Sequence, residues 1–100
     1  MKIGKILSLT ACSVLAGSLY AGSSTMNFAN VYEKECQGCH GPIHQGGVGS
    51  DLRPDALKKK ERHVLRDAIM NGMQNTAMPK WDHMFSKDDA DGMVDWLMDW

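Results

Sequence analysis

The sequence lacks the features that mark several common protein classes. It has no run of alternating β-branched residues that would indicate a β-strand, and it contains no internal repeat or low-complexity tract. Positive charge is not in excess, because eleven Lys and Arg stand against twelve Asp and Glu in 100 residues. The composition therefore predicts a helical protein and gives no indication of nucleic-acid binding.

A long apolar segment occurs only at the start of the chain, where we expect a secretory signal peptide covering 1–21. Lys2 and Lys5 precede an apolar stretch at 6–19, and Leu19-Tyr20-Ala21 offers a cleavage site. The stretch is too short and too weakly flanked to be a good membrane span. Two alternatives are a lipoprotein signal ending at Cys12 and an uncleaved anchor.

Cleavage after Ala21 leaves one small domain, 22–100, of 100 − 21 = 79 residues. The leader holds two of the basic residues and no acid, so the net charge of this domain is 9 − 12 = −3 with His neutral. A domain of this size is near the lower limit for a self-sufficient hydrophobic core. We therefore expect a cofactor or a cross-link to stabilise it.

Cysteine is scarce, and its placement indicates what that cofactor is. Outside the leader only Cys36 and Cys39 remain, and with His40 they form the sequence C-Q-G-C-H. C-x-x-C-H is the pattern of covalent haem attachment. Each thiol adds to a haem vinyl group, and the adjacent histidine reaches the iron as its proximal ligand. Because both thiols are used, no structural disulfide is expected, and haem attachment after export predicts a periplasmic location.

Zinc binding is the main rival role for these residues. Cys36 and Cys39 would then bind zinc with two of the three histidines His44, His63 and His83. Zinc sites usually contain a second compact ligand pair, and the sequence has none. A thioredoxin-like redox pair needs a βαβ context, which is also missing. The sequence thus favours one covalently bound haem c.

The first of three expected helices carries Cys36 to the haem. Its N-cap is expected at Ser24 or Thr25. Its apolar face repeats at helical spacing, which is typical of an amphipathic helix. That face comprises Phe28, Val31, Tyr32 and Cys36. A glycine- and proline-rich loop, 41–54, follows, and the backbone partner of His40 is expected to be a carbonyl group in this loop.

The second and third helices are recognised by their end signals. The second is expected to begin at Pro54, to be strongest over 62–70, and to end at Gly72. The third is expected to begin at Ser86, which forms a capping-box pair with Asp89. Its expected buried face comprises Ala90, Met93, Val94, Leu97 and Trp100. This helix is expected to cross the first one near Phe28 and Tyr32.

The sixth iron ligand is predicted to be Met78. Three methionines, Met73, Met78 and Met84, lie in the loop between the second and third helices. Pro79 fixes the chain after Met78 and biases that residue towards an extended conformation. A thioether ligand raises the reduction potential of haem iron. The alternative ligands are His44, His63 and His83, which would give bis-histidine iron.

Charged residues gather in two places. Their simplest interpretation is a pair of solvated helix faces, and the alternative is an asymmetry that orients the molecule towards a redox partner. The basic cluster comprises Lys58, Lys59, Lys60, Arg62 and Arg66, and the acidic cluster Asp82, Asp88, Asp89, Asp91, Asp95 and Asp99.

With these residues together, the chain resembles class I monohaem cytochromes c. The matching features are Tyr32 four residues before Cys36, the haem motif, Met78-Pro79 and the closing Trp96-Leu97. A closer similarity is to the cytochrome c domain of haem d-containing nitrite reductase and to the small free-standing cytochrome that accompanies it. The residues that carry this similarity are Gly41, Gly46, Gly49, Leu52, Pro54-Asp55 and Met78-Pro79-Lys80-Trp81.

The resemblance implies an all-α cytochrome c fold with three main helices around one covalently bound haem. It implies that Cys36, Cys39, His40 and Met78 hold the haem. A periplasmic monomer with no membrane contact would then carry single electrons to nitrite reductase in denitrification. One alternative is an electron acceptor or assembly factor in haem d maturation. Another is a haem peroxidase or gas sensor with an open sixth position.

Overall fold

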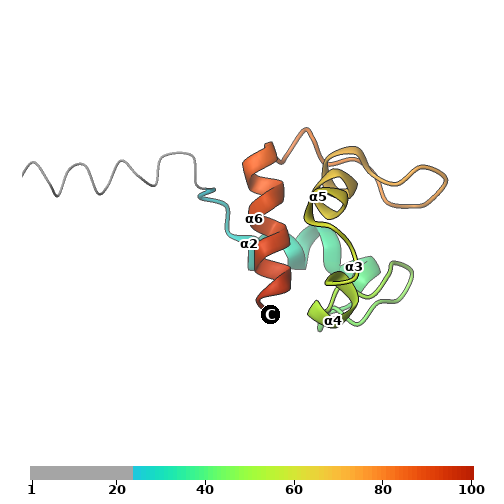
Figure 1. Cartoon of the computed structure of the whole chain (residues 1–100). Coiled ribbons are helices and arrows are strands. Elements are labelled where there is room, and N and C mark those ends of the chain that lie inside the picture. Colours follow the sequence, from blue (N-terminus) through green and yellow to red (C-terminus); the bar gives the residue numbers. More distant parts are fainter. Residues whose placement is uncertain (1–23) are drawn as a thin grey trace, which may run out of the picture.

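The computed structural model describes residues 24–100, so the predicted leader lies outside the described part. From 24 to 100 the chain is helical without a strand, which confirms the all-α prediction (Figure 1). None of the helices in this part has the length and apolar character needed to cross a bilayer. In chain order the elements are α2 (Phe28–Val31), η1 (Tyr32–Cys36), α3 (Gln37–His40), α4 (Pro54–Leu57), α5 (Arg62–Asn71) and α6 (Lys87–Met98).

The elements α2, η1 and α3 run on from one another and together form the first helix. Its N-cap is Asn27, whose side-chain oxygen accepts from the amide of Asn30 at 3.1 Å. The prediction of a cap at Ser24 or Thr25 is therefore wrong. The Ser24 hydroxyl instead donates to the Asp89 carboxylate at 2.6 Å, which ties the segment before the first helix to the start of α6.

A π-helical turn, η1, interrupts the expected regular helix. The amide of Gln37 donates to the carbonyl oxygen of Tyr32, five residues earlier. Such turns hold one extra residue and are frequent at functional sites. The buried Tyr32 and the half-buried Cys36 begin and end this turn, and both side chains reach the same cavity. The turn therefore changes how the first cysteine of the motif is presented.

The second predicted helix is divided into two. Pro54 occupies the first turn of α4, as predicted, but the helix stops after Leu57 and α5 begins at Arg62. Three successive lysines, 58–60, lie in the turn that separates the two helices. Gly72 ends α5 with φ +71°, which confirms the predicted C-cap.

The last helix, α6, begins as predicted. The Ser86 hydroxyl accepts from the Asp89 amide at 3.1 Å, and the Asp89 carboxylate accepts from the Ser86 amide at 3.0 Å. This reciprocal capping box satisfies two backbone donors at once. The buried face comprises Ala90, Met93, Val94 and Leu97. Trp100, expected on that face, lies beyond the helix end and is 52 % exposed.

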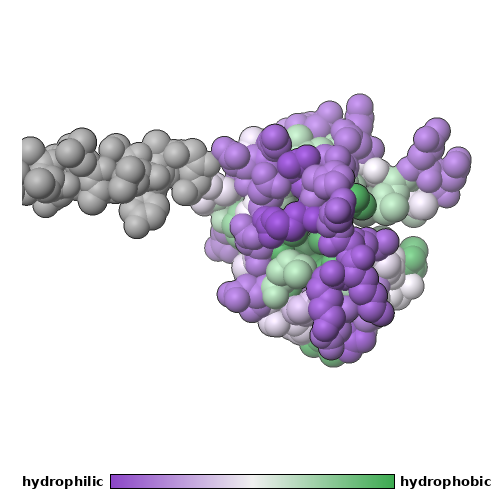
Figure 2. Space-filling view, viewed as in Figure 1, coloured by the Kyte–Doolittle hydropathy of each residue, from purple (hydrophilic) through white to green (hydrophobic). Residues whose placement is uncertain are grey.

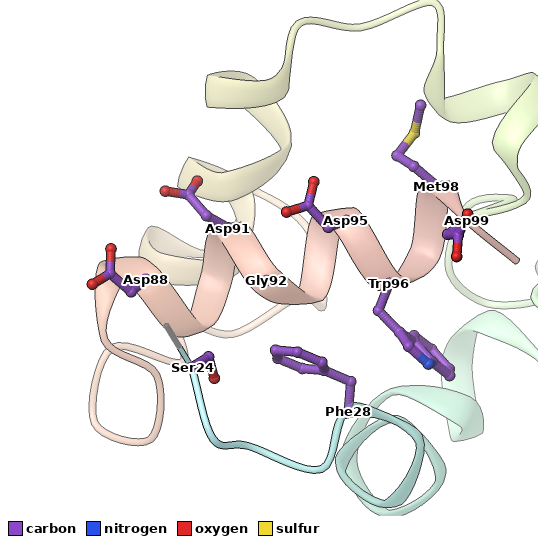
Figure 3. A pocket seen from close by; sticks show the side chains of 9 residues that line it. All are labelled: Ser24, Phe28, Asp88, Asp91, Gly92, Asp95, Trp96, Met98 and Asp99. Atoms are coloured by element: carbon purple, nitrogen blue, oxygen red, sulfur yellow. The ribbon is translucent and has the colours of Figure 1, made fainter. Parts of the chain in front are cut away.

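The first helix and α6 cross where the side chains allow a close approach. Gly92 of α6 faces the ring of Phe28, and a Cβ atom at Gly92 would lie 2.5 Å from the Phe28 Cζ atom (Figure 3). One turn further along, the Tyr32 and Trp96 rings pack with centroids 5.6 Å apart. This confirms the predicted crossing near Phe28 and Tyr32.

The two predicted charge clusters partly neutralise each other. Arg62 of α5 pairs with Asp95 of α6 at 2.6 Å, and Arg66 approaches Asp91 at 3.8 Å. The interpretation as two independent solvated faces is therefore incomplete. The resulting surface is largely hydrophilic on the face seen in Figure 2, with a small apolar area between the charged side chains.

We predict that Gly92→Ala destabilises the holoprotein by about 1 kcal/mol. A methyl group must displace the Phe28 ring, and this overpacking outweighs the helix propensity that alanine adds. The effect is measured by urea unfolding. In a Phe28→Leu background the clash is relieved, so the same substitution there should be neutral or stabilising. A Gly92→Ala protein at least as stable as wild type would contradict the crossing geometry.

Candidate functional site

An apolar cavity of about 330 Å³ lies between the helices and forms the centre of the candidate site. Every helix except α2 contributes side chains to its wall. The wall includes Tyr32, Leu57, Leu65, Ala68, Ile69, Met93, Val94 and Leu97. A second cavity of about 230 Å³ shares part of this wall. Cys36, His40 and Met78 line both cavities, and Cys39 lines the second, so the structure brings the four predicted residues together.

The two cysteines differ in their surroundings. Cys36 is half-buried and Cys39 is exposed, and neither forms a disulfide within the described chain. Burial, with a smaller contribution from the charge of Glu35, raises the pKa of the Cys36 thiol to about 11. Cys36 is therefore a neutral thiol at pH 7, and a metal ion would have to displace its proton in order to bind it.

The zinc interpretation also fails on geometry. Among residues 24–100 no group of three His, Cys, Asp or Glu side chains is placed to hold a metal ion. A structural zinc site needs four such ligands in a tetrahedral arrangement. The described residues thus give no support to this rival role.

His40 ends the first helix and is held by the loop that follows it. Its Nδ1 atom lies 2.7 Å from the carbonyl oxygen of Ser50, which confirms that the partner is a backbone carbonyl in 41–54. A protonated Nδ1 donating to this oxygen leaves Nε2 with its lone pair available for a metal. Gly49 packs against the imidazole, where a Cβ atom would lie 2.7 Å from the His40 Cε1 atom.

Met78 lies in a loop that is closed by hydrogen bonds. The amide of Met73 donates to the Met78 carbonyl oxygen at 3.2 Å, and the Thr76 hydroxyl donates to the Met73 carbonyl oxygen at 2.6 Å. The loop is joined to α5 where the Trp81 amide donates to the Ile69 carbonyl oxygen at 2.9 Å. This places the half-buried Met78 at the wall of both cavities.

The other candidate ligands are less well placed. Met73 also lines the cavities but is 52 % exposed, while Met84 is 38 % exposed and lines neither. His63 and His83 are exposed. Together with His44 they are absent from the walls of both cavities.

His44 is a buried residue whose surroundings the sequence analysis missed. It is 1 % exposed and lies among the rings of Tyr32, Trp96 and Trp100. Burial, followed by the influence of His40, lowers the pKa of its imidazole, so the ring is neutral at pH 7. The i, i+4 spacing of Trp96 and Trp100 is the one signal of an aromatic cluster that the sequence contains.

Trp81 also lines both cavities and is half-buried. It also packs against the hydrophobic core. Its ring stacks on that of His83 at a centroid distance of 5.7 Å. An amphipathic ring at the mouth of an apolar cavity covers that cavity from solvent on one side.

A third hollow, of about 730 Å³, lies between α6 and the segment before the first helix (Figure 3). Four aspartates of α6 border it: Asp88, Asp91, Asp95 and Asp99. None of the four predicted site residues lines this hollow, and its wall contains no cysteine or histidine. It is therefore separate from the candidate site.

A comparison with protein families shows which family the chain matches. The family described as cytochrome c oxidase, cbb3-type, subunit III, matches residues 23–97. The chain belongs to this family. It is a cytochrome c domain and an electron carrier rather than an enzyme. Membership concerns the domain and does not make the chain a subunit of an oxidase.

Individual relatives give a narrower comparison. Cytochrome c55X of Paracoccus denitrificans is 31 % identical over 97 residues, which cover 97 % of this chain and 93 % of that protein. Cytochrome c55X of Pseudomonas aeruginosa is 39 % identical over 66 residues, 66 % of this chain and 56 % of that protein.

Two solved structures share the fold. The c-type cytochrome NirC superposes with a TM-score of 0.69 and 36 % identity, covering 72 % of this chain and 85 % of NirC. The dihydro-haem d1 dehydrogenase NirN, solved in complex with DHE, superposes with a TM-score of 0.64 and 30 % identity. That match covers 69 % of this chain and 15 % of NirN, so it concerns one part of that enzyme.

The residues present fit the haem c that the family implies. The cavity offers an apolar enclosure for a flat apolar ring, two thiols at one edge, an imidazole with a free ring nitrogen and a thioether. When bound, haem supplies an iron that gains and loses one electron. The protein would supply orientation and burial for such a group. The arrangement is suited to electron transfer, which requires no side chain that makes or breaks covalent bonds in a substrate.

Proposed function

We propose that this chain is a periplasmic monohaem electron carrier of denitrification that donates electrons to nitrite reductase. Cys36 and Cys39 would bond the haem through two thioether links, and His40 and Met78 would be the protein ligands of its iron. The observation that supports this most is the convergence of Cys36, His40 and Met78 on one apolar cavity, although Met78 is 38 residues beyond His40.

The ligand pair sets the kind of chemistry. Histidine with methionine raises the potential of haem iron relative to bis-histidine ligation. With both axial positions taken, peroxide or a gas has no open position at the iron, which disfavours the peroxidase and sensor alternatives. The apolar wall limits reorganisation of water around the iron when its charge changes. A carrier that exchanges single electrons needs these properties.

The partner is inferred from similarity. NirC is matched over 85 % of its length, and cytochrome c55X of Paracoccus denitrificans over 93 %. The small free-standing cytochrome of denitrifiers, which the sequence resembles, accompanies haem d-containing nitrite reductase. The periplasmic location is supported by the predicted leader at 1–21 together with the predicted covalent haem.

A second candidate function is electron acceptance during haem d maturation. NirN, described as a dihydro-haem d1 dehydrogenase, contains a part similar to this chain. A dehydrogenase removes electrons from its substrate, and these must pass to an acceptor of suitable potential. A carrier of this type meets that chemical requirement, so both roles are tested below.

We predict that Met78→Leu abolishes sulfur ligation of the iron. The ferric wild-type protein should show the weak near-infrared band of sulfur-to-iron charge transfer, and the variant should lose it and become high-spin. Met73→Leu and Met84→Leu are matched controls from the same loop and should keep the band. Loss of the band in Met73→Leu with retention in Met78→Leu would transfer the ligand role to Met73.

We predict that the reduced protein is reoxidised by nitrite reductase in the presence of nitrite over many turnovers. Stopped-flow absorbance of the haem measures the rate, with nitrite alone as the control. In parallel, the oxidised protein is mixed with NirN and its dihydro-haem d1 substrate. Faster reaction with NirN than with nitrite reductase would favour the maturation role. An absence of reaction with both enzymes would contradict a role in denitrification.

A further inference from the structure

We propose that His44 is a positioning residue whose ring anchors the loop 41–52 and thereby sets the electron affinity of the iron through His40. This rests on the proposed role of His40 as an iron ligand. His44 lines neither cavity, so any effect on the iron must pass through the loop.

The His44 ring lies in a box of three aromatic side chains. It stacks on Trp100 with centroids 4.0 Å apart and planes inclined by 20°. The rings of Tyr32 and Trp96 lie at 4.3 Å and 5.3 Å, inclined by 43° and 47°. Tyr32 belongs to the first helix, Trp96 to α6, and Trp100 to the end of the chain, so the box joins the loop to three separate segments.

The backbone of His44 ties the two ends of the loop together. Its amide donates to the carbonyl oxygen of Gly41 at 3.1 Å, and its carbonyl oxygen accepts from the amide of Leu52 at 2.9 Å. The Tyr32 hydroxyl also donates to the Gly41 carbonyl oxygen, at 2.6 Å. The hydrogen bond between Leu52 and His44 closes the segment that contains Ser50, and the Ser50 carbonyl oxygen lies 2.7 Å from His40 Nδ1. Fixing the ring of His44 therefore fixes the frame that carries the Ser50 carbonyl.

Two features of His44 each lower the stability of the folded protein. Its φ is +63°, in the left-handed region that L-residues seldom adopt, and its buried Nδ1 atom has no hydrogen-bond partner within the described residues. Histidine tolerates the left-handed region better than bulky apolar residues do. The His44 side chain therefore supplies a flat ring to the box. A larger aromatic residue at this position would be strained by the positive φ.

The link to the iron runs through the hydrogen bond at Nδ1 of His40. A carbonyl that accepts from this nitrogen raises the basicity of the imidazole, and a more basic ligand stabilises ferric iron. If the box is weakened, the Ser50 carbonyl is held less firmly and this hydrogen bond weakens. Ferric iron is then less stabilised, so the reduction potential rises.

The test compares holoprotein variants that separate the ring from the backbone. His44→Asn keeps a residue suited to positive φ but removes the aromatic ring. Trp100→Leu removes the stacking partner at the exposed end of the chain, and Trp100→Phe is its conservative counterpart. His63→Asn is the matched control, because His63 is exposed and lies outside the box. The readouts are the midpoint potential and the NMR exchange rate of the His40 Nδ1 proton.

We expect His44→Asn and Trp100→Leu to shift the electron-exchange equilibrium about threefold towards the reduced protein, or about 28 mV at 59 mV per tenfold. Exchange of the His40 Nδ1 proton should become faster in both. Trp100→Phe and His63→Asn should stay near wild type. If His44→Asn fails to fold, Trp100→Leu carries the test.

Two results would overturn the proposal. One is an unchanged potential and exchange rate in both His44→Asn and Trp100→Leu. The other is an equal shift in Trp100→Leu and in its ring-keeping counterpart Trp100→Phe. Failure of the proposed function would be seen separately, as a wild-type spectrum without histidine-ligated low-spin iron.

Discussion

The contact between His40 Nδ1 and the Ser50 carbonyl oxygen, at 2.7 Å, is the interaction on which the rest of the site depends. The first helix delivers His40 next to the two cysteines, but only the loop decides which way its ring faces. Gly49 leaves room for that ring, and the amides of Gly46 and Gly49 donate to the carbonyl oxygens of His40 and Cys39, each at 2.8 Å. The other ring nitrogen of His40, Nε2, is left without this partner in a side chain that lines the apolar cavity.

Much of the fold and the site could be predicted because the decisive signals are local. The capping box at Ser86 and the C-cap at Gly72 depend on residues within one turn, and the structure contains both. The haem motif is a fixed spacing, which brings Cys36 and His40 to one cavity wall. Met78 is predicted as the sixth ligand because proline restricts the residue before it, and Met78 lines both cavities.

The features that were missed depend on contacts between distant residues. Ser24 was predicted as a helix cap because it is a good capping residue, yet its hydroxyl donates to Asp89, 65 positions away. The π turn from Tyr32 to Cys36 leaves the apolar spacing almost unchanged, so periodicity does not reveal it. His44 was considered as a ligand or zinc donor, whereas its ring packs on aromatic residues that the chain supplies more than 50 positions later.

The central claim is that one haem is bonded to the chain through the sulfur atoms of Cys36 and Cys39, next to the histidine that binds its iron. The most direct measurement is intact mass spectrometry of protein made in cells with a working cytochrome c assembly pathway, before and after extraction with acidified acetone. We predict a mass increase of one haem that survives extraction. A polypeptide that shows only its own mass, or that loses its colour to the solvent, would contradict the account.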